Sequence, residues 1–385
     1  IKIMFKKINI ALFSLFISLL GCKTKKESVA VKPETTQNPS LKNSFKDDFL
    51  IGAALNTNQI KELDTSAVAL LKKEFNSITP ENDMKWEQIH PAIDSFYFDI
   101  ADKYLALGEK NNMHIVGHTL VWHSQLAPWM QEVTDSTLMA KYIENHINTI
   151  VGRYKGRINT WDVVNEALNE DGTPRESNFY KLMGSEKYIE LAFKLAAKAD
   201  PDAKLVYNDY NLWKPEKRAG VVRLVKQLQK NGVKIDGVGM QGHWSLKGPS
   251  IEDIENSIIA YAELGVKVSF TELDVTALPN PWDLNGAAIE QSYEKYEGDP
   301  VMNPYPVKLT DSAQTQLANR YEAIFKLFLK HKDKIERVTF WGINDGQSWL
   351  NYWPINGRTN HPLLFDRKNK PKKAYHSVLV QKNKN

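Results

Sequence analysis

Two glutamates in strand-like surroundings carry the main chemical signal of the sequence. Glu166 ends the run Trp161-Asp162-Val163-Val164-Asn165-Glu166, and Glu272 lies within Ser269-Phe270-Thr271-Glu272-Leu273-Asp274. Paired carboxyl groups hydrolyse glycosidic bonds when one protonates the leaving oxygen and the other attacks the anomeric carbon. The types and positions of these two residues therefore indicate glycoside hydrolysis. The alternative interpretation is a pair of structural glutamates, each bound to an Arg or Lys.

More polar residues fall at the predicted ends of strands, where the active sites of parallel barrels lie. They are Glu81, Asn82, His118, His123, Asn165, Asn208, Gln241 and His243, together with the two glutamates. His114, His118 and His123 lack a metal-binding spacing such as H-E-x-x-H. We therefore predict no metal and no cofactor, with His118 bonding to sugar and His114 serving the scaffold. Asp162 and Asp274 are expected to orient His or Arg side chains.

The elements that must position these residues alternate between short β-rich runs and helical stretches. Several of the runs are almost continuously apolar, as in strands buried on both faces. No Gly-rich phosphate turn follows the first run, which disfavours an open doubly wound sheet. The alternation predicts an α/β fold with a single (β/α)8 TIM barrel. The predicted strands are Leu50–Asn56, Ser77–Asn82, His114–Trp122, Ile158–Glu166, Lys204–Tyr210, Gly237–His243, Lys267–Asp274 and Arg337–Asn344.

The first 22 residues have the pattern of a secretion signal. Lys6 and Lys7 precede an almost wholly apolar stretch that is too short for a comfortable transmembrane helix. Leu19-Leu20-Gly21-Cys22 resembles a bacterial lipobox, and Cys22 is the only cysteine of the chain. We predict an exported lipoprotein, anchored through Cys22 to a bacterial membrane in the periplasm or at the cell surface. The alternative is an ordinary signal peptide with a chance cysteine.

The rest of the chain divides into a tether and a body. Residues 23–45 are rich in Lys, Thr, Ser, Asn and Pro, which predicts a flexible tether. Residues 46–383 are predicted to form one catalytic domain, because no internal repeat is visible. Residues 1–46 hold nine Lys and two Glu, a net +7, which leaves −3 for the remainder of a chain whose total is +4. A slightly acidic body argues against nucleic acid as a partner. We also expect the protein to be a monomer.

Across the body the sequence resembles glycoside hydrolase family 10, the endo-β-1,4-xylanases. Seven motifs occur in the family's order, each on its expected strand, and together they are far more specific than any one alone. They are Thr79-Pro80-Glu81-Asn82-Asp83-Met84-Lys85-Trp86, His118-Thr119-Leu120-Val121-Trp122-His123-Ser124-Gln125, Trp161-Asp162-Val163-Val164-Asn165-Glu166-Ala167, Asn208-Asp209-Tyr210-Asn211, Gln241-Gly242-His243, Thr271-Glu272-Leu273-Asp274, and Trp341-Gly342 followed by Ser348-Trp349.

The resemblance implies a retaining mechanism in which Glu166 is the acid/base and Glu272 is the nucleophile. It implies that Asn165 holds the 2-hydroxyl of the sugar under attack. The negative charge of Glu272 is expected to keep the pKa of Glu166 raised. The other implied contacts are Glu81, Asn82 and Lys85 on the next sugar, His118, Gln241 and His243 at the cleavage site, Trp122, Trp341 and Trp349 as walls around the glycone sugars, and Tyr210 as a stacking platform on the leaving-group side.

The predicted function is therefore hydrolysis of internal β-1,4 bonds of xylan through a covalent glycosyl-enzyme intermediate. The alternatives are a retaining glycanase that acts mainly on cellulose or mixed-linkage glucan, and a lipid-anchored glycan-binding protein without catalysis. The long segment 277–310, which contains Trp282, Tyr293, Tyr296 and Tyr305, follows the strand of Glu272. It is interpreted either as an extra sugar platform or as a solvent-facing insertion packed by its own aromatic residues.

Overall fold

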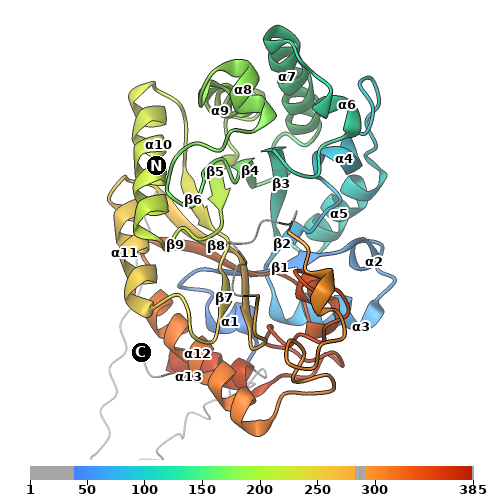
Figure 1. Cartoon of the computed structure of the whole chain (residues 1–385), viewed down its shortest axis with the longest axis vertical. Helices are drawn as coiled ribbons and strands as arrows, with labels where there is room; N and C mark the ends of the chain where they lie inside the picture. The colour runs from blue at the N-terminus through green and yellow to red at the C-terminus, as the bar shows by residue number, and fades with distance from the viewer. Residues whose placement is uncertain (1–38, 282–283, 285–288, 290, 384–385) are drawn as a thin grey trace, which may run out of the picture. The chain divides into compact units, whose positions relative to one another are not determined.

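The computed structural model describes residues 39–281, 284, 289 and 291–383, and its centre is a closed parallel sheet (Figure 1). The strand order is β6-β5-β4-β3-β2-β1-β9-β8, and β6 also pairs with β8, which closes the barrel. This confirms the predicted (β/α)8 fold, and each predicted strand overlaps an observed one. The strands are β1 Leu50–Leu55, β2 Ser77–Pro80, β3 His114–Trp122, β4 Thr160–Asn165, β5 Lys204–Asp209, β6 Gly237–Met240, β7 His243–Ser245, β8 Lys267–Thr276 and β9 Ile335–Phe340.

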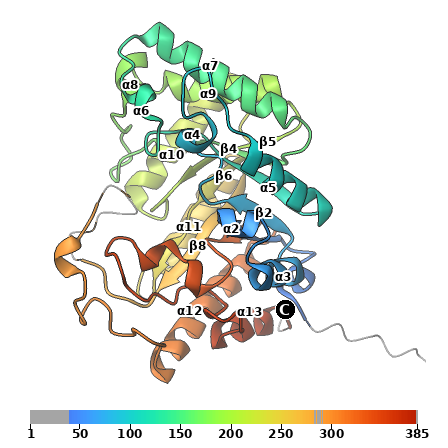
Figure 2. The same cartoon turned by 90° about the vertical axis from the view of Figure 1, so that its right-hand side faces the viewer.

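Helices follow the strands along the chain and lie outside the sheet (Figures 1 and 2). Their starts follow ordinary capping chemistry: the side chains of Asp135, Ser250 and Thr310 accept backbone N–H groups in the first turns of α7, α11 and α12. The α-helices are α1 Leu41–Ser44, α2 Thr57–Ile60, α3 Thr65–Glu74, α4 Trp86–Ile89, α5 Asp99–Lys110, α6 Pro128–Gln131, α7 Ser136–Arg153, α8 Asn178–Met183, α9 Lys187–Ala199, α10 Pro215–Lys230, α11 Ile251–Ala262, α12 Asp311–Lys330 and α13 Lys373–Asn383.

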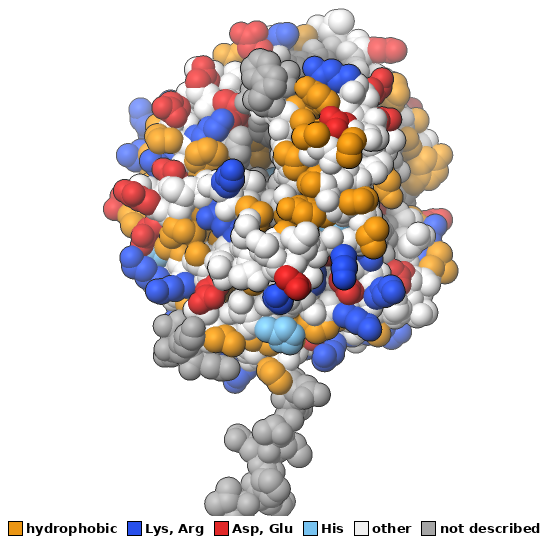
Figure 3. Space-filling view, turned by 60° about the horizontal axis from the view of Figure 1, so that its bottom comes forward, with side chains coloured by type: hydrophobic (Ala, Val, Ile, Leu, Met, Phe, Trp, Pro, Cys, Tyr) orange, Lys and Arg blue, Asp and Glu red, His pale blue; other side chains and the backbone are white. Residues whose placement is uncertain are grey.

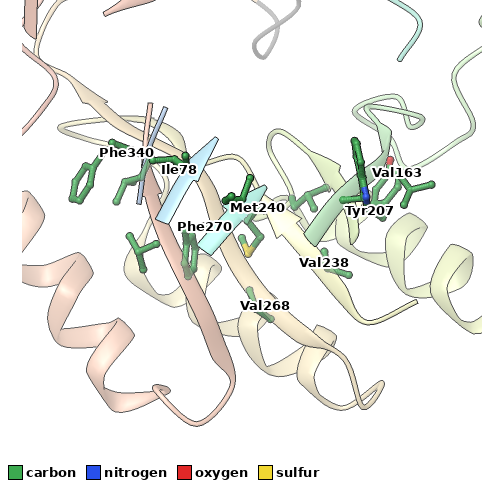
Figure 4. Close-up of a cluster of buried hydrophobic side chains, with 14 of the residues drawn as sticks. Ile78, Val163, Tyr207, Val238, Met240, Val268, Phe270 and Phe340 are labelled. Atoms are coloured by element: carbon green, nitrogen blue, oxygen red, sulfur yellow. The ribbon is translucent and has the colours of Figure 1, made fainter. Parts of the chain in front are cut away.

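The apolar core lies mainly between the strands and the surrounding helices. Figure 4 shows Phe270, Val268 and Phe340 among the side chains of this layer. Phe270 on β8 stacks on Phe328 of α12, with ring centroids 4.0 Å apart. Phe340 on β9 stacks on Phe325 of the same helix at 6.2 Å. This packing holds the strands from the outside of the barrel. Polar side chains can then occupy the positions that face the inside of the barrel.

The strands that position the two glutamates are irregular close to them: Glu166 follows directly after β4, and Glu272 lies within β8. Against β5, the register of β4 shifts between Asp162 and Val164. Against β9, the register of β8 shifts between Phe270 and Leu273. Such bulges re-aim side chains that a regular pleat would send to alternate faces.

The folded unit begins earlier than the sequence prediction placed it. The predicted signal, residues 1–22, and residues 23–38 of the predicted tether lie outside the described residues. Pro39 onward belongs to one compact unit, in which Leu41 and Phe45 are fully buried. The ring of Phe45 lies 5.3 Å from that of Phe49 and 5.4 Å from that of Phe325. The boundary predicted at residue 46 is therefore corrected to residue 39, because these apolar side chains pack into the core.

The long segment after β8 is only partly described, and Trp282 lies outside the described residues. Tyr293 and Tyr296 stack with ring centroids 6.3 Å apart around the short 3-10 helix η1 Glu294–Tyr296. Tyr305 packs against the core, and its carbonyl oxygen lies 3.1 Å from Nε2 of His361. The stacked tyrosines fit an insertion packed by its own aromatic residues, whereas Leu284 and Ile289 of the same segment line the cavities described below.

On the face drawn in Figure 3, basic and acidic side chains are interspersed. Among the described residues, no helix has both the length and the apolar character needed to cross a bilayer.

Replacing Phe45 with alanine is expected to lower the free energy of unfolding by about 3–5 kcal/mol, the usual effect of truncating a buried aromatic side chain. Urea unfolding of the chain starting at residue 39 measures the change. Leu63→Ala is the matched control, since Leu63 is 68% exposed, and it should change stability by less than about 0.5 kcal/mol. Equal stability of Phe45→Ala and wild type would mean that residues 39–45 behave as a tether.

Candidate active site

The carboxyl ends of the strands surround an open cavity of about 600 Å³. Every residue predicted for the site lines this cavity except Tyr210. The lining residues are Glu81, Asn82, Lys85, His118, Trp122, Gln125, Asn165, Glu166, Gln241, His243, Glu272, Ile289, Trp341 and Trp349. A second cavity, of about 1010 Å³, adjoins the first because both are lined by His243 and Trp349.

Glu272 is held as a carboxylate. It is 5% exposed, and burial alone would raise its pKa. The amide of Asn208 donates to Oε1 at 2.8 Å, and Nε2 of His243 lies 3.2 Å from Oε2. These hydrogen bonds and the charges of His118 and His243 outweigh burial, so that the pKa of Glu272 is lowered.

A second carboxylate fixes the histidine beside Glu272. Nδ1 of His243 lies 3.1 Å from Oδ2 of Asp274, and the indole of Trp349 donates to the same oxygen at 2.8 Å. Burial disfavours a charged imidazole, but Asp274 and Glu272 raise the pKa of His243 to about 10. His243 is therefore an imidazolium that donates from both nitrogens, and the predicted orienting role of Asp274 is confirmed.

Glu166 has the opposite electrostatics. Its side chain accepts hydrogen bonds from the indole of Trp122 at 2.8 Å and from the amide of Gln241 at 2.9 Å. Burial raises its pKa to about 7, and the charge of Asp209 adds to this effect ahead of the charge of Glu272. The charge of Glu272 also raises the pKa of Glu166, as the sequence analysis predicted, but burial and the charge of Asp209 contribute more. A pKa near neutrality suits a group that donates and accepts protons.

One side of the cavity carries a lysine among carboxyl and amide groups. Nζ of Lys85 donates to Asn82 at 2.8 Å and to Gln125 at 2.7 Å, and lies 4.9 Å from the ring centroid of Trp122. Burial lowers the pKa of Lys85, against the opposing charges of Glu272 and Glu81. Burial also raises the pKa of Glu81 to about 7. This set offers donors and acceptors of the kind that grip sugar hydroxyl groups.

Amide side chains connect the two glutamates. Oδ1 of Asn165 accepts from Asn208 at 3.0 Å and from Gln241 at 3.3 Å. These contacts use the amide oxygen of Asn165, while its Nδ2 donates to Glu166 at 3.3 Å. Asn208 was noted at a strand end but was not predicted as a site residue, and its place in the motif Asn208-Asp209-Tyr210-Asn211 was the available signal. Gln125 was missed in the same way, at the end of the His118–Gln125 motif.

His118 and His114, both on β3, have separate environments. Nδ1 of His118 lies 3.0 Å from Asp162, which confirms the orienting role predicted for that aspartate. Nε2 of His114 lies 2.9 Å from the hydroxyl of Thr160, as expected for a scaffold residue. No cluster of His, Cys, Asp and Glu that could hold a metal ion occurs among the residues the structure describes.

Tyr210 is not brought to the cavity. It is 3% exposed, its hydroxyl accepts from Arg175 at 2.7 Å, and Nζ of Lys217 lies 3.7 Å from its ring centroid. A ring covered in this way is not a free stacking surface. The sequence could not reveal this, because the covering lysine is on α10, outside the motif.

Comparisons with known proteins agree with the motifs. The model of Glycosyl hydrolase family 10 matches residues 40–381. Endo-1,4-beta-xylanase A of Xylanibacter ruminicola is 46% identical over 347 residues, covering 89% of this chain and 93% of that protein. Beta-1,4-xylanase of Dictyoglomus thermophilum is 42% identical, and the match covers 89% of this chain and 90% of that protein. A family 10 endoxylanase structure from a sugarcane soil metagenome has a TM-score of 0.83 at 45% identity, covering 89% and 99%. The chain belongs to glycosyl hydrolase family 10.

Proposed function

We propose that this protein is a retaining endo-1,4-β-xylanase, which hydrolyses internal β-1,4-xylosidic bonds of xylan. The observation that carries the proposal is the pair of buried carboxyl groups in one cavity, Glu272 with a lowered pKa and Glu166 with a pKa of about 7. Relatives of 36–46% identity that are named as xylanases support the substrate. The adjoining second cavity fits cleavage within a chain, because sugars beyond the reacting pair need room.

In the first step, the carboxylate of Glu272 attacks the anomeric carbon as the bond to the leaving oxygen breaks. Glu166 gives its proton to that oxygen, so the shortened chain departs as an alcohol. The products are an ester between the sugar and Glu272, and an ionised Glu166. Ester formation removes the charge of Glu272, which favours the loss of the proton from Glu166.

In the second step, Glu166 acts as a base. It takes a proton from a water molecule while the water oxygen attacks the anomeric carbon, and the bond to Glu272 breaks. Glu272 leaves as a carboxylate, stabilised by the donors on Asn208 and His243. Two displacements at one carbon restore the original anomeric configuration.

The other lining residues would bind the sugars. We assign Asn165 to the 2-hydroxyl of the reacting sugar, where hydrogen bonds strengthen as the oxocarbenium-like state forms. Glu81, Asn82 and Lys85 would grip the next sugar. Trp341 stands edge-on to His118 with ring centroids 5.5 Å apart, and Trp349 lies 4.8 Å from the ring of His243. These indole walls would limit room for the extra hydroxymethyl group of glucose. The proposed mechanism needs no residue from a second copy of the chain, and we propose that the protein acts as a monomer.

Product analysis with xylan and, separately, cellulose tests this proposal. Xylan alone should release short oligosaccharides of mixed length. Glu272→Ala should abolish release, and Glu166→Gln should reduce it by about 10²–10⁴-fold, the usual contribution of a general acid. Glu263→Ala is the matched control, because Glu263 is exposed and should leave activity unchanged. Release from cellulose instead would overturn the substrate, and binding of xylan without any product would favour a glycan-binding protein.

The electrostatics predict a bell-shaped dependence of kcat/KM on pH. Above the pKa of Glu166, about 7, the acid has lost its proton and the rate should fall. Below the lowered pKa of Glu272 the nucleophile becomes protonated, so the acidic limb should lie under pH 4.5, the ordinary value for Glu. Initial rates on xylo-oligosaccharides from pH 3 to 10 measure both limbs. A basic limb above pH 9 would contradict the assignment of Glu166.

We also propose that the protein is exported and lipid-anchored through Cys22, with residues 23–38 as a tether. The proposal is supported by the basic start, the short apolar stretch and the sequence Leu19-Leu20-Gly21-Cys22, which ends in the single cysteine of the chain. An anchor at a periplasmic or cell-surface membrane would hold the catalytic domain next to an extracellular polymer.

When the full chain is expressed in a bacterium with radiolabelled palmitate, the membrane fraction should contain labelled protein. Cys22→Ser should abolish labelling and leave the hydrolase activity of the full chain unchanged. An unlabelled wild-type protein with its signal removed would instead support an ordinary signal peptide.

A further inference from the structure

A buried ion pair lies behind the site and lines neither cavity. Lys217 on α10 and Asp209 on β5 are both fully buried, and Nζ of Lys217 lies 2.9 Å from Oδ1 of Asp209. Lys217 also donates to Glu170 at 3.2 Å. Removing two charges from water is costly, and a buried ion pair is often no more stabilising than apolar residues of similar size. Stability alone therefore does not account for this ion pair.

Hydrogen bonds lead from Asp209 to the backbone beside Glu166. Oδ2 of Asp209 accepts the hydroxyl hydrogen of Tyr207 at 2.7 Å. The hydroxyl oxygen of Tyr207 in turn accepts the backbone N–H of Ala167 at 3.1 Å, the amide directly after Glu166. The polypeptide on the carboxyl side of Glu166 is thus tied to the ion pair through two hydrogen bonds.

A second connection reaches the carbonyl group of Glu166 itself. Arg175 donates to that oxygen at 2.9 Å and to the hydroxyl of Tyr210 at 2.7 Å. The backbone N–H of Tyr210 is bound by Oδ1 of Asp209 at 2.8 Å, and its ring is covered by Lys217. Glu166 needs such support because its φ of 57° is left-handed, a conformation that is unfavourable for a residue with a side chain.

The same ion pair sets the charge behind the carboxyl group of Glu166. Burial raises the pKa of Asp209, and the ammonium group of Lys217, 2.9 Å away, counteracts part of this rise and so favours the ionised form. The negative charge of Asp209 then disfavours ionisation of Glu166. The charged groups that act on Glu166 come from several elements: Asp209 of β5, Glu272 of β8, Arg175 of the loop after β4, and Lys85 of the loop after β2.

We propose that Lys217 and Asp209 are positioning residues of the reaction, which as an ion pair hold the backbone of Glu166 in place and keep a negative charge behind its carboxyl group. This inference rests on the proposed function, in which Glu166 is the acid/base. It assigns a reaction role to residues that touch no sugar. It also explains why Tyr210 is covered: its ring and hydroxyl belong to the support of Glu166.

The test compares two variants on two aryl β-xylobiosides. Asp209→Asn keeps the shape and an acceptor oxygen but removes the charge, whereas Tyr207→Phe removes only the hydrogen bond. Asp209→Asn should move the basic limb of the kcat/KM profile to lower pH by about one unit, because the pKa of Glu166 falls. Tyr207→Phe should leave that limb in place and lower kcat/KM by about 10–100-fold on a phenyl xylobioside, whose leaving group needs the acid.

A dinitrophenyl xylobioside distinguishes positioning from a loss of structure, since its leaving group departs without protonation. Both variants should retain kcat/KM on it within about threefold. Equal losses on both substrates, or an unshifted limb in Asp209→Asn, would overturn the inference. If Asp209→Asn does not fold, Tyr207→Phe alone tests the inference. Its kcat/KM should then fall on the phenyl xylobioside and not on the dinitrophenyl xylobioside. Glu190→Gln, which breaks an exposed ion pair with Lys194, is the matched control. Failure of wild type on both xylobiosides would refute the proposed function instead.

Discussion

Two carboxyl groups buried in one cavity must be held in opposite protonation states, and most of the barrel mouth serves that requirement. Burial alone raises the pKa of both Glu166 and Glu272. The difference comes from their neighbours. Glu272 receives donors from Asn208 and from a His243 kept charged by Asp274, whereas Glu166 has neutral donors and the negative charge of Asp209 behind it. The asymmetry therefore depends on residues that do not react.

The barrel delivers these neighbours by departing from regular strand geometry at the functional positions. Thr271 and Glu272 are consecutive, yet both contact the side chain of Asn208. A regular pleat would send them to opposite faces, and the register shift in β8 allows both to face inward. In β4 a register shift, followed by the left-handed conformation of Glu166, brings Asn165 and Glu166 to the same amide of Gln241.

The sequence was sufficient to predict the strands and the cavity lining, because the signals for both are local and recur along the chain. Alternating apolar runs predicted eight strands, and motifs at their ends predicted the cavity lining. It was insufficient where the cause was a contact between distant segments. Tyr210 was expected to face sugar, but Lys217 from the following helix covers it. Asp209 belongs to the motif Asn208-Asp209-Tyr210-Asn211, but the sequence does not show that it is buried near Glu166 and raises the pKa of that residue. Phe45 resembled part of a polar tether, and only its packing against α12 shows that it belongs to the core.

The division of labour between the two glutamates is tested most directly by trapping the intermediate with a 2-fluoro xylobioside that carries a good leaving group. The fluorine slows both formation and hydrolysis of the glycosyl-enzyme ester. The good leaving group restores the rate of formation only, so the ester accumulates. Mass spectrometry of the digested protein should then find one 2-fluoro-xylobiosyl group, a disaccharide, attached to the peptide that contains Glu272. Attachment to the peptide of Glu166, or turnover by inversion without any covalent adduct, would contradict the assignment of Glu272 as nucleophile and Glu166 as acid/base.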